Sequence, residues 1–178
     1  MLESVPNLRN LDLSWNLLTT LPGMVFMPLA HLEILNLKGN SLTVIPATSL
    51  WLSTPIIRSI YLNRNEIKTV EEDAFLGIDY NTHIDLSVNQ LKHVPEEAFG
   101  AVLHTFSKGW GILDVSVNHI RCGCDLLWFL TEDAYDRNII YAWCYDLINP
   151  IPHPMNDKFI QDLIVKCNHT SIASPRLN

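Results

Sequence analysis

The stretch LEILNLKGNSLTVI, residues 32–45, decides the fold of this chain because its pattern recurs along the sequence at a nearly constant spacing. It carries apolar residues at its first, fourth, sixth, eleventh and fourteenth places and an asparagine at its ninth. The equivalent asparagines are separated by 24, 25, 24 and 29 residues and are Asn16, Asn40, Asn65, Asn89 and Asn118. Such a pattern with a period of roughly 20–29 residues predicts a solenoid of stacked coils.

Each coil is predicted to contain one short strand, because apolar and polar residues alternate just before each asparagine. The strands are expected near residues 11–13, 35–37, 60–62, 84–86 and 113–115, with apolar residues facing inward. An apolar residue stands ten places after each of the first four asparagines, and we expect these to stack on the convex side: Phe26, Leu50, Phe75 and Phe99. The expected fold is α/β, with a curved parallel sheet on the concave face and short helices or irregular coil on the convex face.

The asparagines are interpreted as structural residues and not as ligands. A buried side-chain amide is tolerated only when it is hydrogen-bonded, and the backbone offers partners where each coil turns. The interval between Asn89 and Asn118 is about five residues longer than the period. Within it, residues 96–106 predict a convex helix, and residues 107–111 form a loop that holds Trp110. This insertion is either simply a longer loop or a contact site for a partner.

All four cysteines follow the last asparagine: Cys122, Cys124, Cys144 and Cys167. Cys122 and Cys124 are too close to pair easily, so the spacing leaves crossed and nested long-range pairs open. Each bridge would stabilise the fold by about 3–4 kcal/mol on the loop-entropy model. A zinc site is disfavoured because the C-x-C pair has no second close pair. Asp125 is expected to cap a helix whose apolar residues plug the end of the solenoid: Leu126, Leu127, Trp128 and Leu130.

The repeats, together with the segment CGCDLLW at residues 122–128, resemble the extracellular leucine-rich-repeat family with a cysteine-rich cap, as in Slit, Toll-like receptor and Nogo-receptor ectodomains. The resemblance implies disulfides Cys122–Cys144 and Cys124–Cys167. Residues 111–118 and 122–128 also resemble secreted arthropod members that are similar to the non-catalytic subunit of oplophorus-luciferin 2-monooxygenase. That likeness implies a companion role, although His119 stands where proline is common.

We expect three regions: one partial and five full repeats at 1–117, the cap at 118–168, and a flexible tail at 169–178. Residues 2–11 match residues 26–35 after a shift of 24, so the chain is expected to start inside a repeat of a longer extracellular protein. No signal peptide is visible, and no run of about 18 apolar residues predicts a membrane span.

The net charge of −7 and the pI near 5.4 argue against nucleic-acid partners and anionic membranes. The even number of clustered cysteines indicates oxidised thiols and a secreted or cell-surface location. Asn168-His-Thr170 is a sequon for N-glycosylation. These features predict an extracellular protein in which Asn168 is a candidate glycosylation site.

The sequence contains no catalytic signature, and we expect neither an enzyme nor a cofactor. His83, Asp85 and Ser87 share one strand face, but His83 and Ser87 lie roughly 13 Å apart, too far for a nucleophile and its base. Asp85 and Asp114 are expected on adjacent strands, where solvated carboxylates are favoured over a calcium site. No metal is therefore predicted.

Function is predicted from the outward-facing residues of the strands. Tyr61 stands in a column otherwise filled by Asp and Asn, and we predict partner binding at Tyr61, Arg64, Lys38, His83, Asp85 and Trp110. The strip measures roughly 400 Å², about half of what a stable interface needs per partner. The chain is predicted to be an extracellular, non-catalytic protein-recognition module. The alternatives are a non-catalytic subunit of a secreted enzyme complex and a fragment of a receptor ectodomain.

Overall fold

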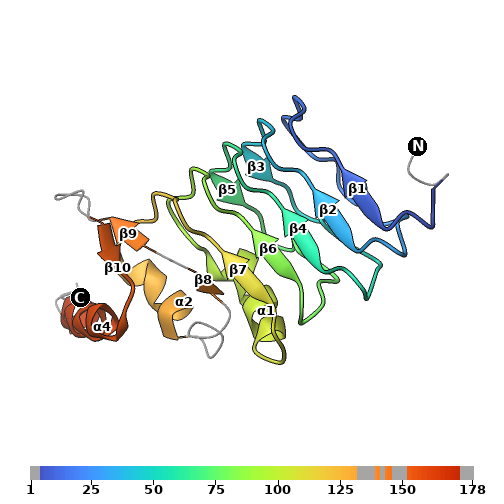
Figure 1. The fold of residues 1–178 in the computed structure, drawn as a ribbon. Helices are drawn as coiled ribbons and strands as arrows, with labels where there is room; N and C mark the ends of the chain where they lie inside the picture. Colours follow the sequence, from blue (N-terminus) through green and yellow to red (C-terminus); the bar gives the residue numbers. More distant parts are fainter. Residues whose placement is uncertain (1–4, 132–138, 141–142, 146–151, 173–178) are drawn as a thin grey trace, which may run out of the picture.

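The computed structural model describes residues 5–131, 139–140, 143–145 and 152–172, and it shows a solenoid built on one parallel sheet (Figure 1). Each coil contributes one strand, and the sheet order is β1-β2-β4-β6-β7-β8. The strands are β1 (Asn10–Asp12), β2 (Ile34–Asn36), β4 (Ser59–Tyr61), β6 (His83–Asp85), β7 (Ile112–Asp114) and β8 (Ile139–Ile140). The predicted α/β fold is confirmed.

The strands begin one residue earlier than the sequence predicted, and the reason lies in the turn that follows them. The leucine expected as the last strand residue, such as Leu13 or Leu37, already leads into that turn. Its N–H still bonds the next coil, as Leu13 does to the carbonyl of Asn36 at 2.8 Å. The side chain of Asp12 then accepts the N–H of Ser14, which bends the chain away from the sheet.

Apolar side chains from every coil fill the interior. The central residue of each inner strand is fully buried, as in Leu35, Ile60, Ile84 and Leu113. The predicted convex stack of Phe26, Leu50, Phe75 and Phe99 is buried as well, and the rings of Phe75 and Phe99 lie 6.1 Å apart. Burial of each such side chain contributes about 1.5–3 kcal/mol, so the stacked coils form one continuous core.

Four of the five predicted asparagines form a hydrogen-bonded ladder, whereas Asn16 is exposed and bonds only its own turn among the described residues. Asn65 donates from Nδ2 to the carbonyl of Leu37 in the preceding coil at 3.0 Å and to that of Leu62 in its own coil at 2.9 Å. Its Oδ1 accepts the N–H of Leu42 at 3.1 Å. The same bonds recur at Asn40, Asn89 and Asn118. Each amide therefore ties its own turn to the preceding coil.

The remaining elements cover the convex side and the C-terminal end. Short strands β3 (Val44–Ile45) and β5 (Thr69–Val70) pair in parallel, and helix α1 (Glu96–Phe106) occupies the predicted residues. The cap comprises the 3-10 turn η2 (Cys124–Leu126), α2 (Leu127–Thr131), the antiparallel strands β9 (Trp143–Tyr145) and β10 (Pro152–Pro154), and α4 (Asp157–Ile172). No helix in the described part of the chain has the length and apolar character needed to cross a membrane.

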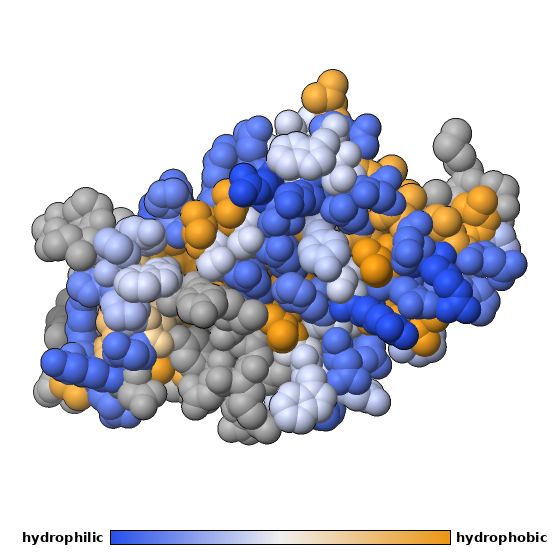
Figure 2. Space-filling view, viewed as in Figure 1, coloured by the Kyte–Doolittle hydropathy of each residue, from blue (hydrophilic) through white to orange (hydrophobic). Residues whose placement is uncertain are grey.

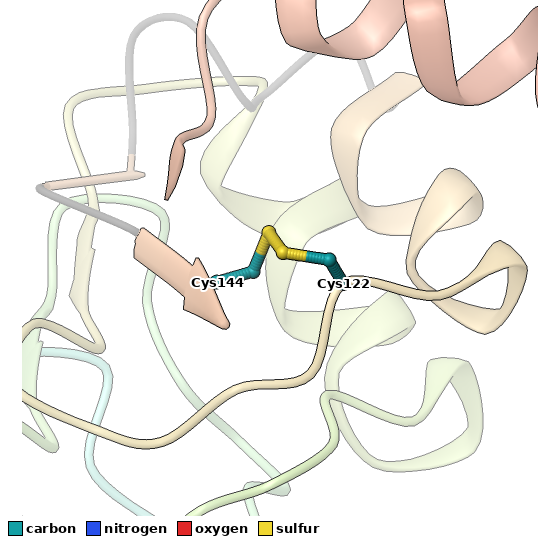
Figure 3. Close-up of a disulfide and its surroundings, with 2 residues drawn as sticks. All are labelled: Cys122 and Cys144. Carbon is teal, nitrogen blue, oxygen red and sulfur yellow. A yellow bond between two sulfur atoms is a disulfide. The ribbon is translucent and has the colours of Figure 1, made fainter. Parts of the chain in front are cut away.

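Two disulfides hold the cap together. Cys122 on the loop after the last repeat is joined to Cys144 on β9 (Figure 3), and Cys124 is joined to Cys167 on α4. These are the pairs that the family resemblance implies. Phe129, Leu126 and Leu130 are buried and close the end of the core.

Two details of the cap differ from the predictions. Asp125 is not the N-cap of a helix: Gly123 precedes η2 without a side-chain cap bond, and Asp125 Oδ2 lies 2.9 Å from His93 Nδ1. This contact holds the carboxylate against an earlier coil instead of the helix N-terminus. The flexible tail was predicted to start at residue 169, but helix α4 continues to Ile172, beyond its disulfide at Cys167. Residues 173–178 lie outside the described residues.

Candidate recognition surface

Two columns of outward-facing strand residues run across the sheet. The strand register places Asn36, Tyr61, Asp85 and Asp114 side by side in one column. The neighbouring column contains Ile34, Ser59, His83 and Ile112. This strand face is largely polar, with separate apolar patches (Figure 2). The columns place residues that are 24 to 29 positions apart in the sequence side by side on adjacent strands.

Most members of the first column have a local structural role. Asp85 and Asp114 each accept the N–H two residues further on, at 2.9 and 2.8 Å, and Asn36 does the same at 3.1 Å. In Asp12 the hydrogen bonds from Ser14 lower the pKa of the carboxyl below its ordinary value. These carboxylates hold their own turns, and the described residues include no cluster of three metal-ligating side chains.

Tyr61 lacks this role, because its side chain ends in a phenol and not in a short acceptor. The ring is half-buried and lies edge-on to the ring of His83, with centroids 6.1 Å apart. His83 Nε2 and Asn63 Oδ1 are buried, and neither has a hydrogen-bond partner among the described residues. Asn63 follows Tyr61 by two residues and was not predicted as a site residue, because no signal in the sequence distinguishes it.

The cations near Tyr61 differ from those at the start of the strands. Arg9 and Arg58 form ion pairs with Glu33. Lys38 and Arg64 have no ion pair within the described part of the chain, and both follow the strand ends on the coils around Tyr61. The structure therefore brings five of the six predicted residues onto three adjacent coils, namely Lys38, Tyr61, Arg64, His83 and Asp85.

Trp110 does not belong to that group. It precedes β7, two strands away from β4, and its backbone N–H donates to Asn81 Oδ1 at 3.1 Å. The side chain is 84% exposed. The adjoining Gly109 packs closely against the ring of Tyr80, where a Cβ would meet that ring at 2.4 Å. Trp110 thus lies on an anchored loop where strand β7 begins, whereas Tyr61 lies where strand β4 ends.

A hollow of about 520 Å³ lies elsewhere, between the start of α1 and the cap, and His93, Glu96, Asp125 and Trp128 are among its lining residues. Trp128 Nε1 donates to the carbonyl of Val94 at 2.8 Å there. The hollow is open and contains none of the residues around Tyr61. It reflects the junction of the cap with the repeats, and we do not assign recognition to it.

One strand per coil, an asparagine ladder and a cap with two disulfides define a leucine-rich-repeat solenoid. The leucine rich repeat family model matches residues 6–53. Toll-like receptor 2 of Ovis aries is 34% identical over 199 residues, covering 98% of this chain and 24% of the receptor. Toll-like receptor 2 type-1 of Gallus gallus is 27% identical over 158 residues, covering 80% of this chain and 19% of the receptor.

Among solved structures, the crystal structure of the TLR13–ssRNA13 complex matches with a TM-score of 0.55 and 24% identity, over 64% of this chain and 15% of that chain. This match supports the fold. The chain therefore has the leucine-rich-repeat fold, and its sequence is similar to a part of the Toll-like receptors. It spans at most 24% of the length of the two receptors described above. The narrower resemblance to the luciferase-companion group is not confirmed.

Proposed function

We propose that this chain is a non-catalytic, extracellular recognition module that binds a protein partner on the concave face around Tyr61. The observation that carries the proposal is the replacement of a turn-forming Asp or Asn by an aromatic residue in one coil. Asn36 and Asp85, its neighbours in the register, both bond their own turns. Tyr61 gives up that bond and presents a ring and a hydroxyl.

Features of the surroundings of Tyr61 support this proposal. A buried polar atom without a hydrogen bond destabilises a fold by about 1–3 kcal/mol, and His83 Nε2 and Asn63 Oδ1 are two such atoms on this face. Both atoms are inaccessible in the free chain, so a partner would hydrogen-bond them, and recover this energy, only after a change of side-chain rotamer. Tyrosine and arginine are also the residues that most often dominate interface energetics. Lys38 and Arg64 extend the site with charge.

The class of partner is inferred from the net charge of the chain and from its similarity to known receptors. The relatives are named as receptors, which supports recognition over catalysis. The TLR13 structure contains single-stranded RNA, but the net charge of −7 in the present chain opposes a polyanion. Two disulfides support an extracellular location, and Asn168 is exposed on α4 as the sequon requires. We therefore favour a protein partner.

A second candidate is a companion subunit that binds an enzyme through the loop where β7 begins. The exposed indole of Trp110 on its anchored loop favours this alternative. Co-purification separates the two: a constitutive one-to-one complex that survives at Tyr61→Asn and is lost at Trp110→Ala supports the companion role.

The direct test places a photo-crosslinking amino acid at position 61 and exposes the secreted chain to extracellular fluid. We expect one cross-linked protein, absent when the crosslinker stands at Arg9 instead. Tyr61→Asn is the matched variant, because asparagine restores the turn bond seen at Asn36. This variant should leave the melting temperature unchanged or slightly raised. It should weaken binding of the captured partner by about 2 kcal/mol or more. Unchanged affinity in this variant contradicts the proposal.

A further inference from the structure

A column of residues in the left-handed backbone region runs along the edge where the strands end. These residues directly precede the ladder asparagines, and their φ angles lie between 52° and 69°: Trp15, Gly39, Arg64, Val88 and Val117. They stack coil on coil, since the N–H of Trp15, Gly39, Arg64 and Val88 each bonds a carbonyl of the next coil at 2.8–3.2 Å. We call these five residues the left-handed ridge.

Val88 and Val117 do not suit this backbone. A β-branched residue in the left-handed region is a rare and strained choice, whereas glycine and asparagine adopt it readily. Gly39 is the residue that the backbone favours here. Val88 is 37% exposed and Val117 is 65% exposed, so core packing does not compensate for the strain. Neither the turn nor the core explains two valines at these positions.

The other members extend the apolar character of the ridge and add charge. The indole of Trp15 lies against Gly39 and is still 67% exposed. Arg64 stands in the middle of the ridge and Lys38 immediately precedes Gly39, and neither has an ion pair among residues 5–131, 139–140, 143–145 and 152–172. Unpaired cations beside apolar groups complement a partner segment that carries carboxylates and apolar side chains.

We propose that the left-handed ridge binds an extended segment of a partner protein in which apolar side chains are accompanied by carboxylates. Four coil-to-coil steps of about 4.8 Å give a length of about 19 Å, which matches about six residues of extended chain. The carboxylates pair with Arg64 and Lys38, and the apolar side chains cover Val88, Val117 and Trp15. This surface shares Lys38 and Arg64 with the concave site around Tyr61, but it does not include Tyr61.

The test uses the whole secreted chain and two labelled peptide pools of eight residues. One pool alternates Leu, Val or Trp with Asp or Glu, and the control pool carries Lys in place of the acids. We expect saturable binding of the acidic pool by fluorescence anisotropy, with NMR shifts at the amides of the ridge. The double variant Val88→Asn/Val117→Asn should weaken this binding at least tenfold while its melting temperature stays equal or rises. Arg64→Gln should weaken it several-fold, and Tyr61→Asn should leave it unchanged.

Several results would overturn the proposal. If no saturable binding is found, or if the lysine pool binds equally well, an acidic peptide segment is not the ligand of the ridge. A lowered melting temperature in the double asparagine variant shows that the valines are structural. Self-association of the wild type in ultracentrifugation that the double variant abolishes makes a second copy the occupant. Peptide binding that Tyr61→Asn abolishes and the ridge variant retains assigns the peptide to the concave face.

Discussion

The first and the last repeat coils that the structure describes use the same sequence motif and differ in what surrounds it. In the first coil Leu11 and Leu13 are only half-buried, whereas their equivalents Leu113 and Val115 in the last coil are almost inaccessible. Asn16 is exposed and donates only to Leu13 and Ser14 in its own turn among the described residues. A repeat therefore acquires its stability from its neighbours, because each coil contacts only the adjacent ones.

The last coil has both kinds of neighbour. The preceding coil offers the carbonyl of Leu86 to Asn118, and the cap covers the other side with Phe129 and Leu130. The disulfides attach β9 and α4 to the loop that carries Cys122 and Cys124. The comparison between the ends leads to four expectations, ordered from the largest effect to the smallest.

Opening the cap should produce the largest loss. Cys144 is fully buried and its replacement by serine breaks the bridge to Cys122, which spans 22 residues. We expect a loss of about 2–5 kcal/mol and failure of Cys144→Ser to be secreted. The amount in the culture medium and the thermal unfolding of any recovered protein give the measurement. The double variant Cys122→Ser/Cys144→Ser serves as the control for a stray thiol. Normal secretion and melting of both variants would contradict a structural role for this bridge.

Truncating equivalent leucines should reveal the difference between the ends directly. Leu113→Ala removes a fully buried side chain and should lower the free energy of unfolding by about 3 kcal/mol, within the range for core leucines. Leu11→Ala, at the half-buried equivalent, should lower it by about 1 kcal/mol. Chemical denaturation of both variants gives the comparison. Equal losses would show that the first coil is as well covered as the last.

The asparagine ladder should show the same asymmetry on a smaller scale. Asn89→Ala leaves two carbonyls and the N–H of Ile67 without their partner, so we expect a loss of about 2 kcal/mol. Asn16→Ala removes bonds on an exposed turn and should have an effect of about 0.5 kcal/mol. The urea unfolding midpoints of both variants, measured against the wild type, test this difference. A large effect at Asn16 would mean that further hydrogen bonds hold the first turn.

The smallest effect concerns the pH dependence of the first coil. Hydrogen bonds from Ser14 lower the pKa of the Asp12 carboxyl below its ordinary value of 3.8. The contribution of this carboxylate to stability is therefore fully present above pH 3.8 and is lost as the pH falls through the lowered folded-state pKa. An NMR titration of the Asp12 carboxyl carbon measures it, with Asp12→Asn as the variant that removes the titration. A midpoint above 3.8 would show that the bonds to Ser14 are not formed in solution.

The repeats could be predicted from the sequence because their signals are local. The spacing of Asn40, Asn65 and Asn89 indicated the coils, and the pattern after Asn89 indicated the helix at residues 96–106. Inward and outward residues follow from the two-residue period of a strand. The columns follow from the repeat length, so the group of residues around Tyr61 could also be predicted from the sequence.

Contacts between residues without a shared pattern were decided only by the tertiary structure. The spacing of the cysteines permits more than one pairing, and the family resemblance was needed to choose between them. The contact of Asp125 with His93 and the buried nitrogen of His83 have no signature in the sequence. Each depends on how neighbouring coils meet in space, whereas the period that specifies the coils is encoded within every repeat.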